Sequence, residues 1–190
     1  MVHRQIEQLI TTDTLVALLR ERATAQGSQR AYTIVVDDVT EVAVSYAELD
    51  RRARIVAARL QALGATGERA LLLYQPGFDY IVGFLGCLYA GVVAVPAYPP
   101  NPARLGRTLP RLQAIAANAG ARFALTTGAI LSLASMVFEV ASDLGALTWL
   151  ATDSADLADA DAWQPTPIGQ ETLAFLQYTS GSTGVPKGVM

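Results

Sequence analysis

The sequence predicts an α/β fold in which a parallel sheet is flanked by helices. From Ala70 onward, short apolar strands alternate with helical segments, and strands that recur between helices of about 10–15 residues are typical of βαβ units. Hydrophobic residues make up 52% and charged residues 16% of the chain. Because strands that are apolar along their whole length need cover on both faces, we expect helices on each side of the sheet.

The first 64 residues are predicted to form two helices around a pair of short strands. Ser45 and Glu48 have the spacing of a capping box, which starts the second helix, and Gly64 ends it. The arginines of this helix are expected to form a solvated face rather than a phosphate site; they are Arg51, Arg52, Arg54 and Arg59. The expected elements are a helix over residues 11–25, strands over 32–36 and 42–44, and a helix over 45–63.

The alternating part of the chain follows, and it ends in an aspartate-rich stretch at residues 152–169. We expect that stretch to be a solvated linker, since its aspartates lack the glycine and glutamate of a calcium-binding loop. The segment from Tyr80 to Ala103 has no charged residue, but Gly91 and four prolines interrupt it, so no membrane span is predicted. The expected strands cover residues 70–74, 92–95, 123–126 and 147–151, and the helices 78–90, 105–119 and 130–141.

Composition excludes several classes of function. The net charge is −3 and no dense block of lysine and arginine occurs, so neither nucleic-acid binding nor attachment to an anionic membrane is expected. Cys87 and His3 are the only residues of their kinds, which excludes a disulfide framework and a Cys/His metal site within the chain. The first ten residues lack the apolar core of a signal peptide, and we expect a cytoplasmic protein.

The residues with chemical potential lie close together after residue 172. An apolar strand predicted over 173–178 leads into a ten-residue segment with four hydroxyl side chains, three glycines and Lys187. Glycines let backbone N–H groups approach an anion, hydroxyls donate to its oxygens, and a lysine neutralises its charge. The segment therefore fits a polyphosphate, although a polar turn between two strands has the same composition.

The Walker A loop of P-loop NTPases is the nearest general alternative. It requires glycine directly before its lysine and serine or threonine directly after it. Here Lys187 lies between Pro186 and Gly188, so that alternative fails at both positions.

Residues 178–189, Tyr-Thr-Ser-Gly-Ser-Thr-Gly-Val-Pro-Lys-Gly-Val, are similar at every position to the signature phosphate loop of the adenylate-forming superfamily. Residues 45–49 and 83–96 resemble earlier segments of the same large domain. Within the superfamily, residues 95–100 and the pair Leu176-Gln177 resemble the fatty acyl-AMP ligases. The resemblance identifies residues 1–190 as the N-terminal portion of an AMP-binding domain, ending just after the phosphate loop.

The resemblance implies activation of a fatty acid by ATP, with Mg²⁺ bound by a ligand beyond residue 190. The acyl-adenylate would then pass to an acyl carrier protein of a polyketide or peptide synthetase. Lys187 would be the catalytic residue. The ATP phosphates would be bound by Thr179, Ser180, Gly181, Ser182, Thr183, Gly184 and Lys187.

Other functions stay open at this point. The chain also resembles acyl-CoA synthetases and peptide-synthetase adenylation domains, and a catalytically dead nucleotide-binding or interaction domain would keep the same loop. The 190 residues alone are expected to be inactive and to self-associate, because their apolar strands lack complete cover.

Overall fold

The computed structural model describes residues 12–35, 41–100, 104–134, 138, 141–154, 159–179 and 187–190. The first elements along the chain are α2 (Leu15–Ala25), β1 (Arg30–Val35), β2 (Glu41–Ser45), α3 (Tyr46–Ala62), β3 (Arg69–Leu73), α4 (Phe78–Ala90) and β4 (Val93–Ala97). They are followed by α5 (Leu105–Ala119), β5 (Phe123–Thr126), α6 (Gly128–Ala134), α7 (Ser142–Gly145), β6 (Thr148–Ala151), the 3₁₀-helix η2 (Ala160–Ala162), β7 (Gln177–Thr179) and β8 (Lys187–Val189).

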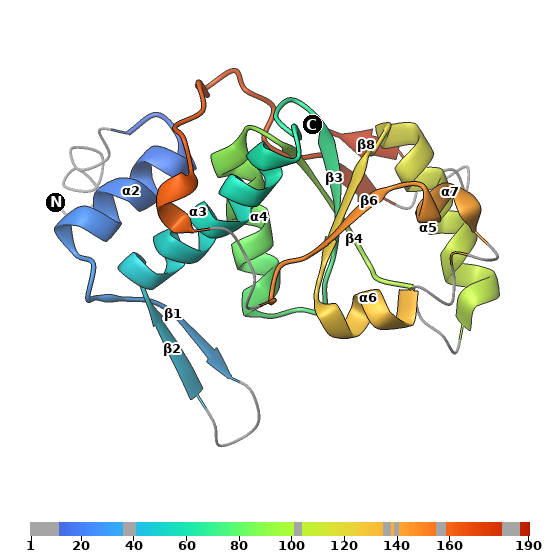
Figure 1. Cartoon of the computed structure of the whole chain (residues 1–190), viewed down its shortest axis with the longest axis horizontal. Coiled ribbons are helices and arrows are strands. Elements are labelled where there is room, and N and C mark those ends of the chain that lie inside the picture. Colours follow the sequence, from blue (N-terminus) through green and yellow to red (C-terminus); the bar gives the residue numbers. More distant parts are fainter. Residues whose placement is uncertain are drawn as a thin grey trace, which may run out of the picture.

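The predicted parallel sheet is confirmed and has four strands in the order β4-β3-β5-β6 (Figure 1). All three pairings are parallel, and Leu71 of β3 lies between Val95 of β4 and Ala124 of β5. The chain therefore adds β4 on one side of β3 and then returns to add β5 and β6 on the other. The carboxyl ends of β3 and β5 form a topological switch point, where open α/β sheets bind their ligands.

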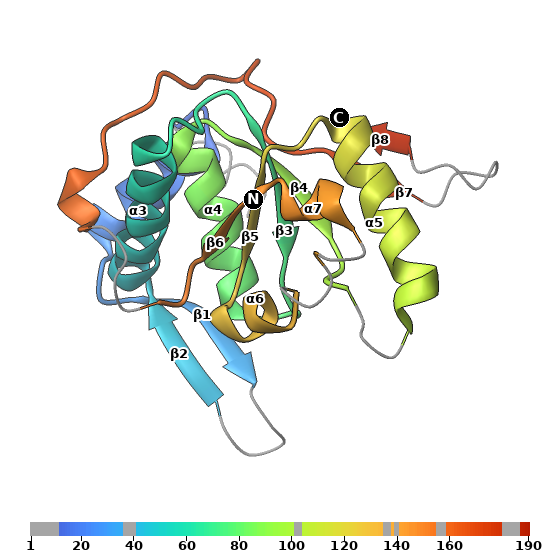
Figure 2. The ribbon, with the colours of Figure 1, turned by 45° about the vertical axis from the view of Figure 1, so that its right-hand side comes forward.

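Helices cover both faces of the sheet (Figure 2). Leu72 points to the face covered by α2, α3 and α4, whereas Leu71 and Leu73 point to the face covered by α5 and α7. All three leucines are fully buried. Successive residues of a strand point to opposite faces, so this continuous apolar run fills two cores at once.

A buried carboxylate joins the three helices of the first layer. Asp50 on α3 is 4% exposed. It accepts a hydrogen bond of 2.8 Å from the Tyr89 hydroxyl of α4, and its carboxylate lies 2.9 Å from Arg54 Nε and 3.3 Å from Arg20 Nη1 of α2. A buried charge is tolerated when it is paired and hydrogen-bonded, and here each partner comes from a position that the helix packing fixes.

The helix predicted over residues 130–141 is wrong in its limits. Helix α6 begins at Gly128, because the Thr127 hydroxyl accepts from the backbone N–H of Ile130 and Asp153 accepts from that of Gly128. Its described residues run to Ala134, and Phe138 lies in a turn with its ring 5.1 Å from that of Trp149. The remainder of the predicted range that the structure describes contains no helix, and α7 starts only at Ser142.

The solvated linker predicted over residues 152–169 is also wrong for its second half. Residues 159–168, called the strap below, lie against α3 and α4. Trp163 Nε1 and Thr166 Oγ1 donate to the Tyr89 carbonyl at 3.0 and 3.1 Å, and Gln61 exchanges two hydrogen bonds with the Gln164 backbone. The carbonyls of the last turn of a helix have no partner within that helix, and the strap supplies one at the end of α4.

The arginines of α3 behave in two ways. Arg51 and Arg52 lie on the exposed face, as predicted, and both pair with Glu48. Arg54 differs from the prediction, because it binds Asp50 on one side and Asp161 of the strap on the other, at 3.1 Å.

In the part of the chain that the structure describes, none of the helices has the length and apolar character needed to cross a bilayer.

Candidate phosphate-binding site

The predicted phosphate-binding segment is carried by a β-hairpin. Strands β7 and β8 pair in antiparallel register, with Thr179 directly opposite Lys187. Both residues are exposed, and they form the pair next to the segment that connects the two strands. The other predicted site residues, Ser180, Gly181, Ser182, Thr183 and Gly184, lie outside the described residues. The structure thus brings the first and last members of the predicted site face to face.

The hairpin is attached to the edge of the sheet through β4. Ala94 donates its backbone N–H to the Ala174 carbonyl at 3.1 Å and accepts from the Leu176 N–H at 2.9 Å. The buried strand predicted over 173–178 is confirmed only in part, because β7 begins at Gln177 and because Leu173 and Phe175 remain about two-fifths exposed. Residues of this edge segment alternate between two faces, and the described helix α5 covers the face of Leu176 and Tyr178.

Tyr178, the middle residue of β7, attaches the hairpin to α5. Its hydroxyl donates to Asn118 Oδ1 at 2.6 Å, and only 7% of the residue is exposed. Burial raises the pKa of this phenol above its ordinary value. On β8, a Cβ atom at Gly188 would lie 3.0 Å from the Tyr178 ring, so this position has no room for a side chain unless the ring shifts.

The sequence did not identify Tyr178 or Asn118 as a contact pair. They lie 60 residues apart, and no local spacing signals such a contact. The one sign in the sequence of a structural role for Tyr178 was its position directly before the polar loop.

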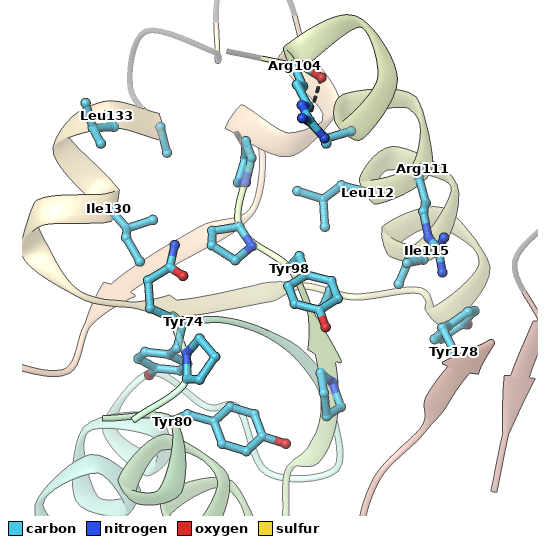
Figure 3. Close-up of a pocket in the computed structure, with 18 of the residues that line it drawn as sticks. Tyr74, Tyr80, Tyr98, Arg104, Arg111, Leu112, Ile115, Ile130, Leu133 and Tyr178 are labelled. Carbon is cyan, nitrogen blue, oxygen red and sulfur yellow. Dashed lines mark hydrogen bonds between the residues drawn. The ribbon is translucent and has the colours of Figure 1, made fainter. Parts of the chain in front are cut away.

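A cavity of about 870 Å³ lies beside the hairpin, at the carboxyl ends of β3 and β4 (Figure 3). Its lining includes residues 96–100, which are part of the segment that resembles the fatty acyl-AMP ligases, and Tyr98 there is 87% exposed. Helices α5 and α6 form opposite walls with Leu112, Ile115, Ile130 and Leu133, and Tyr178 also lines the cavity. The cavity reaches the switch point of the sheet, where the topology predicts a ligand.

Charge at the hairpin suits an anion. Among the described residues, no carboxylate forms an ion pair with Lys187, so its ammonium group can bind a ligand. A lysine and a threonine hydroxyl at the ends of a loop rich in glycine and hydroxyl groups are the donors that a polyphosphate needs. The arrangement can hold phosphate groups and neutralise charge that develops on them.

The chain is similar to known AMP-binding enzymes. The sequence profile of the AMP-binding enzyme family matches residues 19–190. A medium-chain-fatty-acid–[acyl-carrier-protein] ligase from Moorena producens, JamA, is 46% identical over 179 residues, which are 93% of this chain and 30% of that protein.

Two solved structures extend the comparison. A fatty acyl-adenylate ligase from L. pneumophila, in complex with acyl adenylate and pyrophosphate, has a TM-score of 0.81 and 38% identity over 95% of this chain and 30% of its own. A fatty acyl CoA synthetase from Mycobacterium tuberculosis has a TM-score of 0.71 and 28% identity over 92% of this chain and 33% of its own. The chain thus spans about a third of the length of these relatives. With a family profile that covers residues 19–190, it belongs to the AMP-binding enzymes.

Proposed function

We propose that the protein to which this chain belongs activates a fatty acid with ATP and passes it to an acyl carrier protein. The observation that carries the proposal is the β7–β8 hairpin, which sets Thr179 opposite Lys187 at the ends of the predicted phosphate loop. The similarity to a fatty-acid–[acyl-carrier-protein] ligase and to a fatty acyl-adenylate ligase supports this substrate class. Residues 1–190 are the N-terminal portion of the adenylation domain in this proposal.

The proposed reaction has two steps. An oxygen of the fatty-acid carboxylate attacks the α-phosphorus of ATP, and the bond from that phosphorus to the bridging oxygen breaks, so pyrophosphate leaves with the electron pair. Positioning and charge neutralisation govern such a step. A thiolate of the carrier protein then attacks the acyl carbonyl and AMP departs. Magnesium would accompany ATP and neutralise part of the charge on its phosphates.

The proposed roles of the site residues follow from their chemistry. Lys187 places its cation near the β- and γ-phosphates and stabilises the leaving pyrophosphate. The glycines and hydroxyls between the strands donate backbone and side-chain hydrogen bonds to the same oxygens; the residues are Thr179, Ser180, Gly181, Ser182, Thr183 and Gly184. We place the protein in the cytoplasm, where its buried free thiol, Cys87, stays reduced.

The test is an acceptor comparison with the full-length protein. Given ATP and a long-chain fatty acid, it should accumulate acyl-adenylate and load a holo carrier protein while converting CoA poorly, as mass spectrometry of the products would show. Efficient synthesis of acyl-CoA would instead support the second candidate, an acyl-CoA synthetase, which the likeness to the mycobacterial fatty acyl CoA synthetase favours. Pyrophosphate exchange with amino acids alone, or no adenylate at all, would contradict the proposal.

A further inference from the structure

The strands of the phosphate hairpin are held against α5 by one buried side chain. Strands β7 and β8 have three residues each, and Tyr178 is the only one of these six residues that is buried. Its ring belongs to the apolar cluster under α5 that also contains Leu112 and Ile115, and Figure 3 shows it beside Ile115. Within the described residues, the place of the two strands relative to α5 therefore depends on this tyrosine.

Tyr178 lies next to both ends of the predicted phosphate loop. Thr179 follows it directly in β7, and the strand register pairs it with Gly188, which follows Lys187 in β8. The ring lies close to Gly188, since a Cβ atom added there would be 3.0 Å from its Cζ atom and 3.1 Å from its hydroxyl oxygen. A shift of this one ring would therefore move both strands where they enter and leave the loop.

Asn118 fixes the outer end of that ring. It accepts the hydrogen bond of 2.6 Å from the Tyr178 hydroxyl, and it lies one residue before the end of α5. The end of α5 is itself tied to the sheet, because Arg69 of β3 donates to the carbonyls of Ala119 and Gly120 at 3.0 and 2.8 Å. These carbonyls have no partner within the helix. A series of hydrogen bonds thus runs from an inner strand of the sheet, through the end of α5, to the hairpin.

We propose that Asn118 is a positioning residue for the phosphate loop, which it holds in place through the Tyr178 hydroxyl. The inference rests on the proposed function, in which this loop binds the phosphates of ATP. Donors that neutralise charge on a leaving group act best when they are already in place, and a misplacement of about 1 Å can cost about 10²-fold in rate. Asn118 touches neither ATP nor the fatty acid in this proposal. It sets where Thr179 and Lys187 lie.

The experiment removes each partner of the hydrogen bond in the full-length enzyme. Asn118→Ala deletes the acceptor, and Tyr178→Phe deletes the donor while keeping the ring against Gly188. Each variant should lower kcat/KM for ATP in fatty-acid-dependent ATP–pyrophosphate exchange by about fivefold, the typical worth of one hydrogen bond. The KM for the fatty acid should stay the same. The double variant should be within about twofold of the slower single variant, because both single changes remove the same contact.

Two further variants separate positioning from a general effect on the fold. Asn118→Asp keeps an oxygen that accepts from the Tyr178 hydroxyl, so it should recover most of the activity that Asn118→Ala loses. Gln113→Ala is the matched control, because it removes another hydrogen bond of an α5 side chain, the 2.8 Å contact with Asp143, which lies away from the hairpin. Its exchange activity should stay within about twofold of the parent. Both alanine variants should lower the melting temperature by no more than about 4 °C.

A second assay supplies preformed acyl-adenylate and holo carrier protein. Loading in Asn118→Ala should stay within about twofold of the parent, because pyrophosphate has already left before this step. Unchanged exchange in Asn118→Ala and Tyr178→Phe would overturn the inference. Equal losses in exchange and loading, or in Gln113→Ala, would also overturn it, because they would show a general structural role.

The parent enzyme separates this inference from the proposed function. Exchange with amino acids and none with fatty acids would contradict the proposed function. The same variants, measured with the acid that is accepted, would then still decide whether Asn118 positions the phosphate loop.

Discussion

Lys187 is the side chain with the clearest expected effect on the reaction. In the full-length enzyme, Lys187→Ala should slow acyl-adenylate formation by about 10²-fold or more, because the negative charge on the leaving pyrophosphate grows in the transition state. Fatty-acid binding should change little, since the substrate carboxylate does not depend on this cation. Pyrophosphate release at saturating fatty acid measures the effect. Unchanged release would remove Lys187 from the mechanism.

The carboxylate of Glu48 makes the stability of the fold depend on pH. Its carboxylate lies 2.8 Å from Arg51 Nε and 2.6 Å from Arg52 Nε, and the hydrogen bond to Arg51 is the main reason why its pKa falls from 4.5 to about 2. The depressed pKa means that the charged form stabilises the fold above pH 4.5, and that this contribution disappears between pH 4.5 and about 2.

Glu48→Gln should therefore lower the free energy of unfolding at neutral pH by about 0.5–1 kcal/mol, a modest value because the group is partly exposed. The difference from the parent should vanish toward pH 2. Urea denaturation over this pH range tests both points. A difference independent of pH would show that the carboxylate charge is not the cause.

At the residue scale, the sequence predicted what local spacing controls. Ser45 caps α3 by accepting from the Glu48 N–H at 3.3 Å, which is one half of the predicted capping box; the Glu48 carboxylate pairs with Arg51 and Arg52. The ion pairs of the Glu48 carboxylate were not predicted, nor was the inward turn of Arg54. Those contacts depend on which side chains other elements bring near, and Asp161 is 107 residues away from Arg54.

At the scale of elements, the contact between α3 and α4 depends on a glycine. A Cβ atom at Gly86 would lie 2.5 Å from Val56 Cγ1, closer than packed side chains allow. Gly86→Ala should destabilise the protein by about 1–3 kcal/mol, because the helices would have to separate. Gly106→Ala on α5 is the matched control. Beyond its own helix backbone, no atom of the described residues lies within 4 Å of the added Cβ there, so the change should be neutral or stabilise by up to about 1 kcal/mol.

Denaturant unfolding of both variants in the full-length protein measures these two values. Equal stability of the two variants would mean that α4 relaxes around the new methyl group.

Elements that are apolar runs between glycines or prolines were predicted well. Helix α4 has the predicted limits, and β5 matches residue for residue, because apolar runs between glycines and prolines determine where they begin and end. The strap was mistaken for a solvated linker because its composition is polar. Its place is determined by Trp163 and by the free carbonyl at the end of α4, which no local pattern reveals. The cavity was not predicted for the same reason. It lies between elements that only the order of the strands in the sheet brings together.

At the scale of the whole molecule, exposed apolar surface predicts association of the 190-residue chain. Tyr32 and Val42 on the β1–β2 hairpin and Leu173 and Phe175 beside β4 are each more than a third exposed. Exposed strands with apolar side chains favour edge pairing between chains. The isolated chain should be inactive and oligomeric at micromolar concentration, as light scattering would show. A compact monomer that catalyses ATP–pyrophosphate exchange would contradict both expectations.

The family was recognisable from the sequence at this scale, because a phosphate loop is a contiguous signal. Twelve consecutive residues, 178–189, carry it, and the chemistry of glycine, hydroxyl and lysine is read without any tertiary contact.

The strap also sets an order of events during synthesis on the ribosome. Arg54 and the Tyr89 carbonyl wait for partners that lie 107 and 74 residues further along the chain. At about 5–20 residues per second, the Arg54 partner is translated roughly 5–20 s after Arg54 itself. Until the strap has been synthesised, the Tyr89 carbonyl lacks the hydrogen bonds that Trp163 and Thr166 donate to it. The strap can therefore complete the first layer only shortly before β7 and β8 of the phosphate hairpin are translated.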